Sequence, residues 1–166
     1  MNLEQAITLV EYNAWANRRV LLKAMHLTPE ELNDTNNLSH GSVFATLVHI
    51  LDAQWYWREG AQTGNLPIKK LSTADFTGVS KLRGRWEEED RLLLSYVQGL
   101  SEGELLGSVT YKWPQARPRT RPLWHILLHI THHATQHRTE VGLQLAAFGH
   151  SPGDLDFIKF VSRQRQ

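Results

Sequence analysis

Residues 122–149, PLWHILLHITHHATQHRTEVGLQLAAFG, decide the fold and contain the strongest local anomaly of the chain. Thr120 before Pro122 is a signature of a helix start, because proline is tolerated in the first turn, and Gly149 is a stop signal. Apolar residues recur between them at helical spacing, at Leu123, Ile126, Leu127 and Ile130. The stretch therefore predicts a long helix that runs through Ala147.

Similar apolar patterns predict three more long helices. We expect them over residues 2–26, 42–59 and 76–97, the second capped by Ser42 and stopped at Gly60. Residues 101–121 are rich in Gly, Pro and Arg and contain one β-compatible stretch, 108–113, which predicts a long loop with room for a hairpin. Asp154 is placed to cap a short last helix to about Val161.

These elements predict an all-α fold of one domain, residues 1–166. We expect a four-helix bundle of the antiparallel type, with a long loop before the fourth helix and a short extra C-terminal helix. A chain of 166 residues is long enough to bury a core without disulfides.

Composition excludes several classes of function. The 18 Lys and Arg residues nearly balance 17 Asp and Glu residues, so we expect no broad attraction for nucleic acid or for an anionic membrane. The chain has no cysteine, which removes thiolate metal ligands and a cysteine nucleophile. The N-terminal residues read as a helix, not a signal peptide, and no apolar run reaches the length of a membrane span. We therefore expect a cytoplasmic protein.

Four of the histidines form one row on the predicted fourth helix. His125, His129, His133 and His137 follow each other at a spacing of four residues, whereas His132 points elsewhere. The row extends over about 18 Å at a rise of about 1.5 Å per residue, so only two or three of its rings can meet at one ion. A row of this kind is either a metal-binding face or a polar, solvent-facing seam.

A metal on this row needs a further ligand from a facing helix. His49 is the candidate, because it lies among apolar residues of the second predicted helix, where an unpaired polar ring is expensive to bury. The alternative is a ring at the edge of the core that is hydrogen-bonded to a carbonyl.

Three separated segments resemble the DinB-like family. The stretch Leu128–Asp156, LHITHHATQHRTEVGLQLAAFGHSPGDLD, is similar to its C-terminal motif, with His133, His137 and Arg138 as the His-x-x-x-His-Arg core. The segment YNAWAN at 12–17 and the segment LVH at 47–49 resemble the motifs of its first and second helices.

The resemblance implies a four-helix bundle, often a homodimer, that holds one divalent metal ion. Carried over by motif position, the metal ligands are His49, His133 and His137, with His125 and His129 left beside the substrate or behind the ligands. Zinc and nickel are the favoured ions, and iron and manganese are open. The chain departs from the common family pattern directly after Arg138, where Thr139-Glu140 stands in place of Gly-Gln.

Three neutral imidazoles leave the charge of the ion uncompensated and a coordination position open, as in reactive zinc sites. We therefore expect a metal-dependent enzyme that acts on a small molecule, by transfer of a low-molecular-weight thiol to an electrophile or by hydrolysis. The alternative is a non-catalytic metal-binding or stress-response interaction protein.

Other side chains are candidates for supporting roles. Glu140 is the candidate catalytic residue, three residues beyond His137, and Asp52 is placed to orient a ligand ring or to lie on the helix surface. Arg138 is interpreted as an anion-binding or a structural ion-pair residue. The tryptophans at 15, 55, 57, 113 and 124 are assigned to the core or an interface before a substrate mouth.

Overall fold

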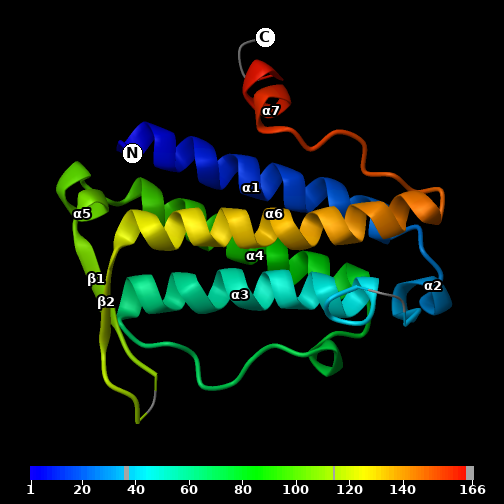
Figure 1. Cartoon of the computed structure of the whole chain (residues 1–166), viewed down its shortest axis with the longest axis horizontal. Helices are drawn as coiled ribbons and strands as arrows, with labels where there is room; N and C mark the ends of the chain where they lie inside the picture. Colours follow the sequence, from blue (N-terminus) through cyan, green and yellow to red (C-terminus); the bar gives the residue numbers. More distant parts are fainter. Residues whose placement is uncertain (36–37, 114, 164–166) are drawn as a thin grey trace.

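In the computed structural model, which describes residues 1–35, 38–113 and 115–163, four long helices lie side by side (Figure 1). They are α1 (Leu3–Ala24), α3 (Val43–Thr63), α4 (Val79–Gln98) and α6 (Leu123–Ala147). Helix α1 packs against α4 and α6, and α3 packs against the same two helices. The prediction of an all-α four-helix bundle is confirmed.

The helix directions differ from a simple antiparallel bundle. Figure 1 shows α1 and α6 running one way and α3 and α4 running the other way. The chain must therefore return along the bundle between α3 and α4, and it does so through residues 64–78, which include the short 3-10 helix η1 (Thr73–Asp75). Extended chain covers about 3.3 Å per residue against about 1.5 Å in a helix, so this crossover is long enough.

The first two long helices begin at side-chain caps. Asn2 accepts a hydrogen bond from the Gln5 amide at the start of α1, and Ser42 accepts one from the Ala45 amide at the start of α3. The predicted end of α3 at Gly60 is wrong, since the helix continues to Thr63 and ends at Gly64 with a φ of 73°. Gly60 serves packing instead, because a Cβ at this position would lie 2.6 Å from Leu66 Cδ2.

A hairpin precedes the fourth long helix. Strands β1 (Ser108–Tyr111) and β2 (Arg119–Pro122) pair antiparallel, with Thr110 opposite Thr120. The interpretation of Thr120 as part of a helix start is therefore wrong, and α6 begins at Leu123 after Pro122. The two threonine hydroxyls lie 2.8 Å apart, so Thr120 makes a cross-strand contact in the hairpin.

Three short helices complete the described chain. The last helix, α7, covers Phe157–Arg163 rather than 154–161, and Asp154 pairs with Lys159 instead of capping it. Helices α2 (Pro29–Asn33) and α5 (Glu102–Leu106) were not expected. Each has a capping box, from Thr28 with Glu31 and from Ser101 with Glu104, a signal that was present in the sequence.

The core lies between the four long helices and contains one buried ion pair. Trp86 of α4 is fully buried, and Arg58 of α3 binds Glu89 of α4 through two hydrogen bonds of 2.5 and 3.0 Å.

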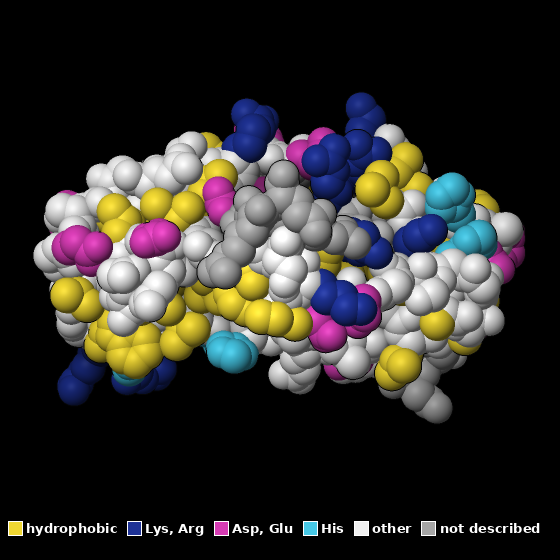
Figure 2. All heavy atoms as spheres, turned by 90° about the horizontal axis from the view of Figure 1, so that it is seen from above, with side chains coloured by type: hydrophobic (Ala, Val, Ile, Leu, Met, Phe, Trp, Pro, Cys, Tyr) yellow, Lys and Arg dark blue, Asp and Glu magenta, His cyan; other side chains and the backbone are white. Residues whose placement is uncertain are grey.

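On the face shown in Figure 2, basic and acidic side chains are interspersed. None of the described helices combines the length and the apolar character that a membrane span needs.

Candidate metal centre

The structure brings His49, His133 and His137 together between α3 and α6. His49 projects from α3, and the other two residues lie one turn apart on α6. The ring centroid of His49 lies 4.8 Å from that of His133 and 4.8 Å from that of His137. The centroids of His133 and His137 are 4.6 Å apart. Two segments that are 84 residues apart in sequence thus place imidazoles in one small volume.

One pair of nitrogens has a separation that suits a shared ion. His49 Nε2 lies 3.0 Å from His133 Nε2. Two nitrogens bound to one ion at about 2.0–2.1 Å, with an angle of about 90–110° at the ion, lie about 2.9–3.4 Å apart. These two rings could therefore hold a divalent ion without a change of backbone.

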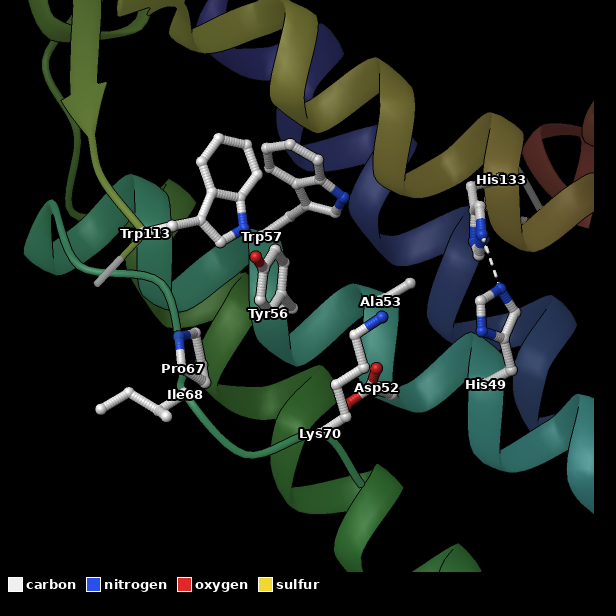
Figure 3. A pocket seen from close by; sticks show the side chains of 10 residues that line it. All are labelled: His49, Asp52, Ala53, Tyr56, Trp57, Pro67, Ile68, Lys70, Trp113 and His133. Carbon is white, nitrogen blue, oxygen red and sulfur yellow. Dashed lines mark hydrogen bonds between the residues drawn. The ribbon is translucent and has the colours of Figure 1, made fainter. Parts of the chain in front are cut away.

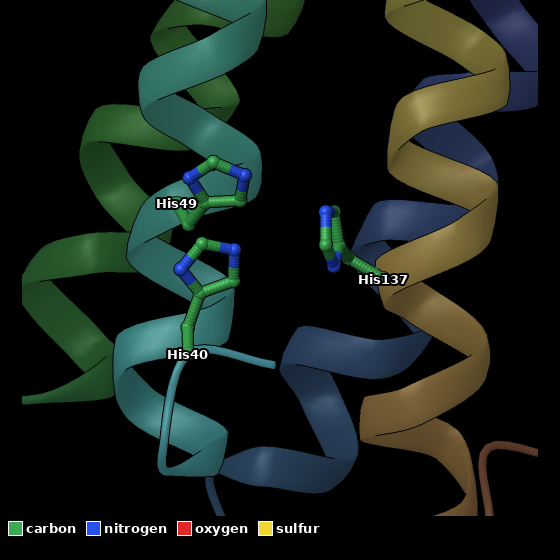
Figure 4. A group of neighbouring side chains, drawn as sticks. All are labelled: His40, His49 and His137. Atoms are coloured by element: carbon green, nitrogen blue, oxygen red, sulfur yellow. The ribbon is translucent and has the colours of Figure 1, made fainter. Parts of the chain in front are cut away.

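A fourth imidazole, that of His40, lies in the same cluster (Figure 4). It precedes the Ser42 cap, and Gly41, at a φ of 88°, turns the chain between them. One nitrogen from each of His40, His49 and His137 can be chosen so that all three lie within 4.8 Å of one another. Sequence reasoning missed His40, because a loop residue has no periodicity that places it on a face.

The ring planes distinguish His40 from His133. His40 is stacked on His49, with centroids 3.6 Å apart and planes inclined by 23°. The lone pair of an imidazole lies in the ring plane, so two nearly parallel stacked rings cannot both direct lone pairs well at one ion. His133 is inclined by 55° to His49 and by 66° to His137, and His40 is inclined by 69° to His137. Within the cluster, the ring planes thus separate the stacked pair His40 and His49 from the inclined pair His49 and His133.

Three rings of the cluster, those of His40, His49 and His133, are held in the neutral form that a metal requires. Burial, reinforced by the neighbouring histidines, lowers the pKa of His49 to about 4 and that of His133 to about 3. Burial and His137 lower the pKa of His40 as well. Because a metal-bound imidazole must be deprotonated, these rings offer free lone pairs at neutral pH.

Glu140 lies behind His137 rather than in front of it. Its Oε1 is 3.3 Å from His137 Nδ1, and its Oε2 accepts hydrogen bonds from the Ser39 amide and hydroxyl at 3.1 and 2.6 Å. Burial alone would raise the pKa of Glu140, but the Ser39 hydrogen bonds hold it below its ordinary value. A carboxylate at Nδ1 favours the tautomer with a free lone pair on Nε2. Its contacts are those of a residue that orients a ligand.

The remaining histidines of the row lie away from the cluster. His125 and His129 are exposed and line a separate cavity of about 240 Å³, together with Arg121 and Trp57. His132, which does not belong to the row, is exposed as well. The ring centroid of His129 is 5.5 Å from that of His133, so the row continues beyond the cluster without joining it.

Arg138 is structural and makes hydrogen bonds rather than the expected ion pair or anion site. Its side chain is buried, and Nη1 donates to Asn13 Oδ1 and Asn17 Oδ1 of α1 at 2.6 Å each, while Nη2 donates to Thr135. This contact explains why the two asparagines lie four residues apart in the first motif. Because Arg138 follows His137, the network also fixes the rotation of α6 that aims His137 at the cluster.

A cavity of about 440 Å³ opens beside the histidines (Figure 3). His49 and His133 line one part of it, and Tyr56, Trp57 and Trp113 line another. Trp57 and Trp113 pack against the hydrophobic core, as expected, and they also line this cavity. Asp52 also lines the cavity, but its Oδ1 accepts a hydrogen bond from the Leu71 amide at 2.7 Å, so the crossover, and not a histidine ring, is the partner that the structure gives it.

Comparison with known proteins identifies the family of the chain. The family model described as the DinB family matches residues 1–166. No curated protein matched the sequence. The match extends over the whole chain and includes the segments that supply all four clustered imidazoles and the asparagine contacts of Arg138. The chain therefore belongs to the DinB family.

Proposed function

We propose that this protein is a metal-dependent enzyme that acts on a small molecule through one divalent ion held by His49, His133 and His137. The observation that carries the proposal is that His49 and His133 belong both to the imidazole cluster and to the lining of the 440 Å³ cavity. A small molecule in the cavity would lie directly against the ligands. A purely structural ion needs no such access.

The donor set supports a reactive site. Three neutral imidazoles leave the charge of a bound ion uncompensated and leave room for a further ligand. When bound, such an ion polarises a carbonyl or lowers the pKa of a water or thiol. The reactions that fit are transfer of a low-molecular-weight thiol to an electrophile and hydrolysis. Since the chain has no cysteine, the thiol would be a co-substrate.

The side chains around the histidines have separate tasks in this proposal. Glu140 orients His137 through Nδ1, and Ser39 holds the Glu140 carboxylate. Asp52 is the carboxylate that lines the cavity, and burial raises its pKa despite the Leu71 hydrogen bond. Asp52 is therefore better placed than Glu140 to exchange a proton with a bound substrate, which revises the expectation that Glu140 is the catalytic group.

The test is turnover by protein of known metal content. Protein loaded with zinc or nickel is incubated with a thiol and a panel of small electrophiles, and separately with a panel of esters and amides. We expect turnover with at least one panel that is lost on chelation and restored by the ion. The double variant His49→Ala, His133→Ala should lose this turnover, and Lys69→Met, which does not line the cavity, should keep it. Metal-loaded protein without turnover in either panel would favour the non-catalytic alternative.

A further inference from the structure

The cavity beside the histidines has two chemically different ends. Its volume of about 440 Å³ is within the range of cavities that bind small ligands, about 300–1,000 Å³. One end presents the imidazoles of His49 and His133, and the other presents aromatic rings and the apolar side chains of Pro67 and Ile68 (Figure 3). A ligand that fills it must combine an apolar body with a polar group.

The aromatic end is held in place by edge contacts between rings. Trp57 meets Tyr56 at 5.8 Å and Tyr111 at 5.5 Å between centroids, with interplanar angles of 89° in both cases. Trp113 contacts Tyr111 at 5.8 Å. Such contacts fix ring orientation, so this wall is shaped before a ligand arrives and favours a flat, rigid body.

Ile68 indicates that the apolar surface is incomplete in the free protein. Its side chain is 85% exposed although it lines the cavity. A bound apolar group would remove part of that side chain from water, which is favourable in proportion to the area covered. Nothing comparable is gained by a small hydrophilic ligand.

Lys70 supplies the positive charge of the lining. It makes no ion pair with any carboxylate among the residues that the structure describes, whereas the adjacent Lys69 binds Asp75 at 3.0 Å. Its charge acts on both His49 and Asp52 across the cavity. The carboxylate of Asp52 is buried and accepts the Leu71 amide, so the exposed Lys70 ammonium is the more available charge for a ligand.

We propose that this cavity binds a small aromatic carboxylate, with the ring against Tyr56, Trp57 and Trp113 and the carboxylate at Lys70. This inference rests on the proposed function and names the substrate class of the same site. An aromatic carboxylate has a flat ring that fits the aromatic wall, an apolar surface that covers Ile68 and a negative charge that pairs with the ammonium of Lys70. It also places its charged group between the aromatic end and the histidines, where Lys70 lies in Figure 3.

The test measures binding of 2-naphthoate by calorimetry, with the neutral 2-naphthamide and with acetate as comparison ligands. We expect naphthoate to bind about tenfold more tightly than naphthamide, the ratio typical of one charge-assisted hydrogen bond, and acetate to bind far more weakly than either. Lys70→Met should abolish the preference for naphthoate, and Lys69→Met should retain it. Trp113→Leu should weaken both aromatic ligands, and Trp124→Leu should weaken neither.

The measurement is made on metal-free and on metal-loaded protein. Loss of the preference in Lys70→Met under both conditions supports the assignment. Equal binding of naphthoate and naphthamide to the unmodified protein, or equal losses in Lys70→Met and Lys69→Met, would overturn it. Absence of naphthoate binding would also overturn it. Metal content and turnover are measured on the same preparations, so failure of this inference is distinguishable from failure of the proposed function.

Discussion

His49 Nε2 and His133 Nε2 face each other across the gap between α3 and α6 at 3.0 Å. Both imidazoles are neutral at physiological pH because burial and neighbouring rings depress their pKa values. A single proton can bridge the two nitrogens, and so can a metal ion, but two charged rings cannot occupy these positions. The pair is therefore the centre of the proposed site, to which the other residues contribute a third ligand, an orienting carboxylate or a cavity wall.

The inclination of the ring planes predicts different effects for two histidine variants. His133→Ala should weaken the binding of zinc by more than about 100-fold, because it removes a direct ligand. Loss of a residue that only orients a ligand costs about 10–100-fold. His40→Ala should change affinity by less than about tenfold, because a ring stacked on His49 is poorly directed at the same ion. Competition with a chromophoric chelator measures both constants, with His129→Ala as control. A larger loss in His40→Ala than in His133→Ala would reverse the assignment of the ligands.

Glu140 should act through His137. Glu140→Gln replaces the carboxylate at Nδ1 by an amide and should lower zinc affinity by about tenfold, the usual range for a partner of a metal-bound histidine. The fold should be unaffected, because the Glu140 side chain is partly exposed and contacts Ser39 near the surface. Chelator competition and far-UV circular dichroism check the two statements, and Glu87→Gln on α4 is the matched control. Unchanged affinity would leave Glu140 without a role at the ligand.

Arg138 should be required for stability and not for recognition of a ligand. Arg138→Met leaves the amide oxygens of Asn13 and Asn17 without their 2.6 Å donor in a buried site. We expect a loss of about 2–4 kcal/mol in the free energy of unfolding, as for other broken buried networks. Denaturant unfolding of chelator-treated protein measures it, with the exposed Arg18→Met expected to change stability by less than about 0.5 kcal/mol. Similar stabilities for both variants would contradict the structural role.

Asp90 should give the fold a specific dependence on pH. Burial raises its pKa to about 6, although Gln54 and Asn17 hydrogen-bond to it and Arg138 acts from α6. The unfolded carboxyl has a pKa of about 3.9, so the folded state binds the proton more tightly and this group destabilises the fold as pH rises from about 4 to about 6. Asp90→Asn has no such titration.

The difference in the free energy of unfolding between Asp90→Asn and the unmodified protein should therefore shift in favour of the variant by about 1–3 kcal/mol over that interval. Urea unfolding at several pH values, with chelator present throughout, measures this difference. Other titrating groups cancel, because both proteins contain them. A difference that stays constant between pH 4 and 7 would show that Asp90 has an ordinary pKa.

The sequence predicted the parts of this structure that depend on local pattern. The apolar periodicity located the four long helices, and the four-residue spacing of histidines identified a face on α6 that does contain His133 and His137. A helix cap was predictable where a side chain that accepts hydrogen bonds precedes the free amides of a helix start, as at Ser42. Gly60 was wrongly predicted to end the helix. Glycine is needed there because a side chain would meet Leu66 across a turn, and no local sequence pattern records such a contact.

The features that the sequence did not predict depend on tertiary contact. His40 joins the cluster only because Gly41 turns the loop over α3, and the partners of Arg138 are two asparagines more than a hundred residues away. The parallel pairing of α3 and α4 follows from how the crossover is laid along the bundle (Figure 1). Lys70 lies in that crossover, so the sequence could not predict that it lines the cavity.

Elemental analysis of the dialysed protein tests the central claim most directly. The account predicts close to one equivalent of a divalent ion for each chain of the unmodified protein, and almost none in the double variant His133→Ala, His137→Ala. Full metal content in that double variant, with the fold intact by circular dichroism, would contradict the account, because the ion would then be held somewhere other than between α3 and α6.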